Sequence, residues 1–154
     1  MYDTILVPHG GTKAGDEALR HAIHIAKLDS SKIIILNVIE PWPEQSLDYW
    51  DEDDISNKNQ VEVILSNMKE GVRKFLAEQV AHCRKEGLKC EGIFRIGKPS
   101  DSIIKYANEE KIDLIIMAKK KKILNYKSLF KIGNVTKKVQ EKTNCPILLV
   151  EVEN

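Results

Sequence analysis

Residues 32–39 read Lys-Ile-Ile-Ile-Leu-Asn-Val-Ile, an almost unbroken apolar run. Such a run without alternation is typical of a strand covered on both faces, as in a parallel sheet packed between helices. A strand-like segment at 4–8 precedes it, together with a helical segment from Thr12 to about Leu28. A strand, a helix and a second buried strand in this order predict a parallel βαβ unit.

The same alternation continues to the end of the chain. The remaining predicted elements are a helix from about Asn57 to Glu86 with Ser56 as its cap, a strand at Leu88–Ile96, a helix from Pro99 to about Glu110, a strand at Ile112–Met117, a helix from about Gly133 to Thr143 and a strand at Pro146–Val152. Gly87 is expected to end the long helix. Five strands and four helices predict an α/β fold, an open doubly wound parallel sheet with helices on both faces, and residues 1–154 fit one domain.

Composition excludes several classes of protein. The three cysteines are too few and too scattered for a disulfide framework, and no Cys or His cluster has the spacing of a zinc site. No window approaches the roughly 18 apolar residues of a membrane span, and the first residues lack the pattern of a targeting segment. We therefore expect a cytoplasmic protein without a membrane segment or a metal.

The net charge of +1 is a cancellation between two segments. Residues 40–60 hold seven acidic side chains and one lysine, a net charge of −6, whereas residues 119–143 hold nine lysines and one glutamate, a net charge of +8. Both segments follow strands of the predicted sheet and so rise from the same edge. They are either solvated loops or, as a hypothesis, an acidic lid that folds toward a basic loop.

A ligand site is expected at the carboxyl ends of the strands, where the strand order reverses. Four segments should converge there, namely residues 8–12, 38–41, 97–99 and 117–135. Within the last segment, Lys119 to Lys122 supply positive charge, and the helix start at Gly133-Asn134 supplies free N–H groups for an anion.

Several motifs in a fixed order resemble one known family. They are the opening Tyr2-Asp3-Thr4-Ile5-Leu6-Val7-Pro8, Asn37-Val38-Ile39, Gly97-x-Pro99, the string from Ile112 to Met117, Gly133-Asn134-Val135 and the terminal string from Asn144 to Val150. Together they resemble the universal stress protein family, of the adenine nucleotide alpha-hydrolase-like superfamily, from end to end. The resemblance implies the strand order 3-2-1-4-5, cytoplasmic residence and a homodimer formed by the last strand.

The resemblance also implies a site, and this sequence departs from it. Family members that bind ATP or AMP have an acid just after the first strand, but Gly10 stands at that position. They also have a glycine loop after the fourth strand, where Ala118 and Lys121 replace the first two glycines. Only Gly133 remains, displaced by two residues and followed by Asn134. Side chains in place of glycine prevent the close approach of backbone N–H groups to phosphate.

We therefore predict a non-catalytic stress-response or signalling module with a degenerate nucleotide pocket. The alternative is a member that binds ATP or AMP, or slowly hydrolyses ATP, and holds the phosphates through Lys119 to Lys122 and the Gly133 helix start. A weaker alternative is an adaptor that binds an acidic partner or RNA on the basic loop. No catalytic residue is assigned, because no histidine has a matched nucleophile and acid. The candidate cofactor-binding residues are Pro8, His9, Gly10, Thr12, Val38, Gly97, Met117, Ala118, Lys121, Gly133, Asn134 and Val135.

The partners follow from the last strand and the basic loop. Ile147 to Val152 would leave an exposed apolar edge in a monomer, and pairing with a second copy would cover it. A small anionic or nucleotide ligand is expected at the loop. Nucleic acid is not expected there, because Tyr126 and Phe130 do not interleave with the lysines to stack on bases.

Overall fold

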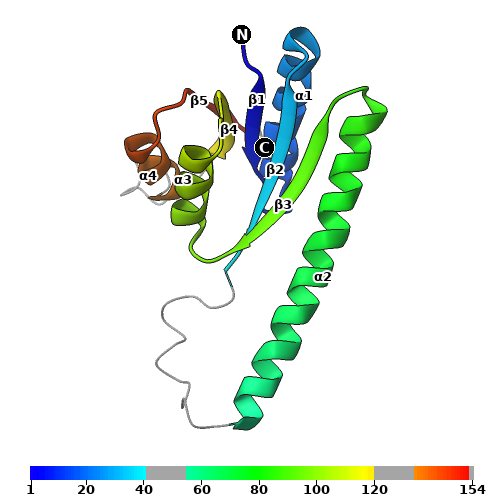
Figure 1. The fold of residues 1–154 in the computed structure, drawn as a ribbon, viewed down its shortest axis with the longest axis vertical. Coiled ribbons are helices and arrows are strands. Elements are labelled where there is room, and N and C mark those ends of the chain that lie inside the picture. Colours follow the sequence, from blue (N-terminus) through cyan, green and yellow to red (C-terminus); the bar gives the residue numbers. More distant parts are fainter. Residues whose placement is uncertain (41–54, 120–133, 153–154) are drawn as a thin grey trace.

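The centre of the fold is a sheet of five strands: β1 (Thr4–Pro8), β2 (Lys32–Ile39), β3 (Cys90–Ile96), β4 (Leu114–Lys119) and β5 (Ile147–Glu151). This computed structural model describes residues 1–40, 55–119 and 134–152, without the side chains of 55–58. All neighbouring strands are parallel, and their order is β3-β2-β1-β4-β5 (Figure 1). The predicted doubly wound sheet and its order are confirmed.

Helices cover both faces of this sheet. They are α1 (Lys13–Asp29), α2 (Ile55–Lys85), α3 (Pro99–Glu109) and α4 (Asn134–Lys142). Residues of α1 and α2 pack into one buried cluster with the sheet, and residues of α3 and α4 pack into a second cluster on the other face. None of the helices in the described part of the chain is long and apolar enough to cross a membrane.

The unbroken apolar run of β2 is explained by these two layers. Ile33 and Ile35 face the cluster beneath α1 and α2, whereas Ile34 and Leu36 face the cluster beneath α3 and α4. All of them are at most 5% exposed. Successive side chains of a strand point to opposite faces, so both faces must be apolar when both are covered.

The predicted stop of the long helix is also confirmed. Gly87 follows α2 with a φ of +81°, and its N–H donates to the carbonyl of Arg84 at 3.0 Å. Glycine adopts this left-handed conformation at little cost, which is why it terminates helices. The predicted cap was wrong, because α2 begins at Ile55 and Ser56 therefore lies inside it.

Three strands begin later than the sequence predicts. β3 begins at Cys90 instead of Leu88, β4 begins at Leu114 instead of Ile112, and β5 begins at Ile147 instead of Pro146. Ile112 is buried in the second cluster without joining the sheet, so its apolar character was mistaken for strand character. Asp113 then accepts the N–H of Thr4 at 2.8 Å through Oδ2, which ties the start of β4 to that of β1.

Candidate functional site

The carboxyl ends of the parallel strands lie at one edge of the sheet, called the ligand edge below. Strand order reverses between β1 and β4, which pair through Ile5 with Leu114 and Leu6 with Ile115. The turn after β3 belongs to the same edge, because the N–H of Gly97 donates to the carbonyl of Ile39 at 2.9 Å. Gly97 has a φ of +148°, a conformation that L side chains rarely adopt.

The turn after β1 is anchored to β2 by hydrogen bonds on both sides of His9. The N–H of His9 donates to the carbonyl of Leu36 at 2.9 Å. Its carbonyl accepts from Nδ2 of Asn37, also at 2.9 Å. Asn37 is 8% exposed and His9 only 2% exposed. The main chain of His9 is therefore fixed at the ligand edge.

The imidazole ring of His9 is buried between the first turn of α1 and Phe75 of α2. Its Nδ1 accepts the N–H of Gly11 at 3.1 Å, so the proton of the neutral ring is on Nε2, which lies 3.1 Å from Oδ1 of Asp16. The ring makes an edge-to-face contact with Phe75 of α2, with centroids 4.9 Å apart. Burial lowers the pKa of His9, and the nearby Asp16 carboxylate opposes this shift in part.

Gly15 of α1 makes room for this ring. A Cβ atom at Gly15 would lie 2.3 Å from Nδ1 of His9, closer than atoms can approach. The first turn of α1 therefore packs directly on the imidazole. Glycine in a helix interior costs about 1 kcal/mol relative to alanine, and here that cost is offset by the buried ring.

The backbone N–H groups near Gly10 are bonded inside the turn. Gly11, with a φ of +73°, donates to His9, and Gly15 donates to Oγ1 of Thr12 at 3.2 Å. Thr12 is thus confirmed as the cap of α1. These two N–H groups are already engaged and do not face a ligand. Gly10 itself is exposed, and a Cβ atom there would meet nothing within 4 Å.

Other predicted site residues lie in the strands and in α4. Pro8 ends β1 half-buried, Val38 is half-buried in β2, and Asn134 begins α4 as an exposed residue. Met117 is buried in the second core cluster, whereas Val135 packs against that cluster and Ala118 against the first. Lys121 and Gly133 lie outside the described residues, as do Lys120, Lys122 and residues 41–54 of the acidic segment.

Lys119 is the one lysine of the run that the structure describes. Its Nζ lies 2.9 Å from Oε1 of Glu151, the residue opposite it on β5. Both side chains are partly exposed, so the pair contributes little to stability. It does place a carboxylate next to this ammonium, which reduces the positive charge that Lys119 presents to an anion.

Known proteins match the chain over its whole length. The sequence model of the Universal stress protein family matches residues 1–151. The chain belongs to the universal stress protein family. Universal stress protein MJ0577 of Methanocaldococcus jannaschii is 28% identical over 100% of this chain and 98% of its own length. Universal stress protein YxiE of Bacillus subtilis is also 28% identical, over 97% of this chain and 99% of its own length.

Solved structures of the family share the fold. The structure of MJ0577 superposes with a TM-score of 0.80 at 27% identity, over 100% of this chain and 99% of that one. A universal stress protein family protein of Arabidopsis thaliana, solved with AMP bound, gives a TM-score of 0.63 at 15% identity, over 98% and 92% of the two chains. A universal stress protein in complex with cAMP gives 0.62 at 20% identity, over 97% of each chain.

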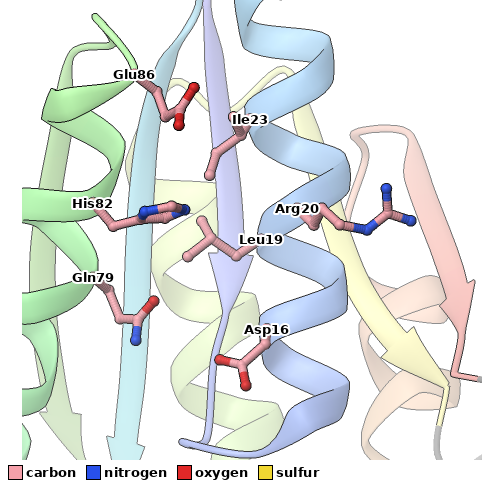
Figure 2. Close-up of a pocket in the computed structure, with 7 residues that line it drawn as sticks. All are labelled: Asp16, Leu19, Arg20, Ile23, Gln79, His82 and Glu86. Atoms are coloured by element: carbon pink, nitrogen blue, oxygen red, sulfur yellow. The ribbon is translucent and has the colours of Figure 1, made fainter.

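A groove between α1 and α2 was not predicted from the sequence. It has a volume of about 430 Å³ and is lined by Asp16, Leu19, Arg20, Ile23, Gln79, His82 and Glu86. Figure 2 shows Gln79 and His82 of α2 pointing toward α1, whereas Arg20 points away from the groove. Lys27 forms an ion pair with Glu86, and its ammonium holds the pKa of that carboxyl below its usual value. Asp16 connects this groove to the buried ring of His9.

Sequence reasoning missed the residues that hold His9. The sequence predicts Asp16 as an acid in the first turn of a helix and Asn37 as part of a strand. It does not predict that either residue contacts His9. The one available signal was Asn37 itself, because a polar residue inside an otherwise apolar buried strand needs a hydrogen-bond partner.

Proposed function

We propose that this family member is a cytoplasmic, non-catalytic stress-response binding module whose nucleotide pocket is degenerate. The ligand edge binds a small anionic ligand of the adenine nucleotide class weakly. The observation that carries the proposal is the turn after β1. Gly10 has no side chain to hold a ligand, and the N–H groups of Gly11 and Gly15 are bonded within the turn.

The chemistry of the described residues supports a role without catalysis. His9 is an acid–base group by residue type, but its ring is buried and both of its nitrogen atoms have partners. A general base must reach the proton that it removes, and this ring is buried between α1 and α2. The turn after β1 therefore fixes the backbone at the ligand edge and does not supply a reactive side chain.

The ligand class is supported by structures of the same fold. Family proteins have been solved with cAMP, with dAMP and with AMP. The sheet edge at which ligands of doubly wound folds bind is present in this chain, whose strand order is β3-β2-β1-β4-β5. An adenine nucleotide is thus the first ligand to test, and the substitutions at Gly10 and Ala118 are the reason to expect low affinity.

Isothermal titration of the full chain with AMP, cAMP and ATP tests this function. We expect dissociation constants in the millimolar range or no measurable heat, and no release of phosphate from ATP. Micromolar binding of any of the three would contradict the degenerate pocket and favour the alternative, nucleotide binding through Lys119 to Lys122 and the start of α4. Steady release of phosphate would contradict the non-catalytic role.

We also propose a homodimer through β5. This strand lies at an edge of the sheet and pairs with β4 on one side. Ile147, Leu148 and Leu149 are half-buried in the single chain, and addition of a second β5 would cover them. A replacement of Leu148 by lysine should lower the mass measured by sedimentation at micromolar concentration. An unchanged mass would argue against this interface.

A further inference from the structure

Two of the three cysteines lie close together where α2 ends and β3 begins. Cys83 belongs to the last turn of α2, and Cys90 is the first residue of β3. Cys83 is fully buried and Cys90 is 4% exposed, and both belong to the core cluster beneath α1 and α2. Two thiols on consecutive elements therefore occupy one buried site.

The turn between the two cysteines folds the chain back onto the end of α2. The carbonyl of Cys83 accepts the N–H of Glu86 at 3.1 Å and the N–H of Leu88 at 3.2 Å. Leu88 then packs against the same cluster that contains both cysteines. Nη2 of Arg84, the residue after Cys83, donates to the carbonyl of Cys90 at 3.4 Å. The backbone and the side chain of Arg84 thus hold the start of β3 against the last turn of α2.

The two thiols interact directly. A side-chain hydrogen bond joins Cys83 and Cys90, and it is the largest influence on the pKa of each. The bond lowers the pKa of Cys83 and raises the pKa of Cys90, because the S–H of Cys90 donates to the thiolate of Cys83. The thiolate is the nucleophilic form of a cysteine, so Cys83 is the attacking sulfur of the pair.

We propose that Cys83 and Cys90 are a modification site, at which a hydroperoxide oxidises the two thiols to a reversible intramolecular disulfide. With hydrogen peroxide, the Cys83 thiolate attacks one oxygen, the O–O bond breaks, and the hydroxide that leaves takes up the proton lost by Cys83. Cys83 is then a sulfenic acid. The Cys90 thiol attacks the Cys83 sulfur, the S–S bond forms, and the sulfenic hydroxyl leaves with the Cys90 proton as water. Two thiols are oxidised and one peroxide is reduced to two molecules of water.

Access to this pair is through the turn that covers it. Residues 84–87 and 89 are exposed, and Leu88 is half-buried. β3 is an outer strand that pairs with β2 on one side. Local opening of the turn admits a small oxidant without separating the strands of the sheet. Disulfides of cytosolic proteins are usually transient and redox-sensing, which suits a buried pair of this kind. The site is independent of the ligand edge and of the proposed function.

Peptide mapping of the full chain tests the disulfide. Cys145→Ser removes the third thiol, so that a loss of thiols reports on the pair alone. Trypsin cleaves after Arg84 and after Lys89, which places Cys83 in peptide 75–84 and Cys90 in peptide 90–95, and neither peptide contains methionine. After treatment of the folded protein with hydrogen peroxide, digestion without a reductant should give these two peptides crosslinked, with a mass two hydrogen atoms below their sum. A reductant should separate them.

Cys83→Ser in the same background supplies the matched control, because Cys90 then has no partner thiol and the crosslinked pair cannot form. The crosslinked chain should keep its near-UV circular dichroism and unfold at a higher urea concentration than the reduced chain, since the new bond restricts the unfolded state. The proposal is overturned if both thiols can still be titrated after the treatment, or if the peptides gain oxygen without a crosslink. It is also overturned if the crosslinked chain loses the signal of the folded protein.

Discussion

Nε2 of His9 lies 3.1 Å from Oδ1 of Asp16, and this contact joins the turn after β1 to the first turn of α1. The side chain of His9 is fully buried, whereas that of Asp16 is 60% exposed. Nδ1 of the same ring accepts from Gly11. One neutral imidazole therefore holds a helix on one side and the glycine turn at the ligand edge on the other.

Acid should destabilise the protein through this ring. The pKa of His9 is lowered by burial in the folded state, while the unfolded chain takes up the proton near pH 6.5. Below that value the unfolded state binds more protons, so the stability contributed by His9 is present above pH 6.5 and is lost as the pH falls. Urea unfolding from pH 8 to pH 5 should show a steeper loss in wild type than in His9→Gln. Parallel slopes would show that His9 does not contribute.

Gly15→Ala should destabilise the fold although alanine favours helices. The added methyl group would lie 2.3 Å from Nδ1 of His9, and we expect a loss of about 2 kcal/mol in the free energy of unfolding. Gly71→Ala is the control, because it occupies open space and should gain about 1 kcal/mol. Both are measured by urea unfolding at low protein concentration. Equal gains in the two variants would rule out the packing of α1 on His9.

Asn37→Leu should cost about 1–3 kcal/mol, because the buried carbonyl of His9 loses its hydrogen-bond donor. Asn108→Leu removes a similar bond, from Nδ2 to the carbonyl of Lys142 at 3.2 Å, but at an exposed site where water replaces the donor. Its cost should stay below about 0.5 kcal/mol. Thermal or urea unfolding compares the two, and similar costs would contradict the anchoring role of Asn37.

Gly10→Asp should improve binding of AMP. It places an acid where the family resemblance implies one in members that bind nucleotide, and the new side chain has free space. One added hydrogen bond to a charged group is worth about 1.5–3 kcal/mol, so affinity should rise roughly tenfold or more in calorimetry. Gly10→Ala changes the backbone in the same way without adding an acid and should not gain affinity. A gain in both variants, or in neither, would mean that the missing acid is not what limits binding.

The three thiols should react in a fixed order. Cys145 is half-buried, whereas Cys83 is fully buried and Cys90 is 4% exposed. A thiol reagent should therefore label Cys145 first. Cys83 and Cys90 should react only after local or global unfolding exposes them. The rate at Cys145 should increase with pH because the thiolate is the reactive form, and the increase should extend to higher pH than for an ordinary thiol because burial raises the pKa of Cys145. Cys145→Ser should abolish the fast phase, and a fast phase that persists would locate the accessible thiol elsewhere.

Most of the fold could be predicted because it is encoded in local patterns. The bounds of β1 and β2 were predicted to the residue from apolar runs that end at a turn, and Thr12 and Gly87 marked helix ends through their own chemistry. The start of β4 was predicted wrongly because Ile112 is buried although it lies in a turn before the strand. An apolar residue in the sequence does not show whether it is buried in a strand or in a turn.

The location of the candidate site could be predicted from the sequence, but the arrangement of its side chains could not. The ligand edge follows from topology, so Gly10 and Gly97 could be assigned to it from their positions after strands. The direction of the His9 ring could not, because it depends on how Phe75 and Gly15 approach from two helices far apart in sequence. The main chain of a residue that follows a strand lies at the ligand edge. Its side chain can still be buried elsewhere when a helix packs against it.

The two outer strands of the sheet differ in their chemistry. On β3, Glu91 forms an ion pair with Lys32, and the guanidinium of Arg95 lies over the ring of Tyr106. Charges along an outer strand discourage the addition of another strand. On β5 the run from Ile147 to Val150 carries no charge. If two copies pair through β5 as proposed, the charged β3 edges discourage further strand addition, so that pair would stay closed and would not grow into a fibril.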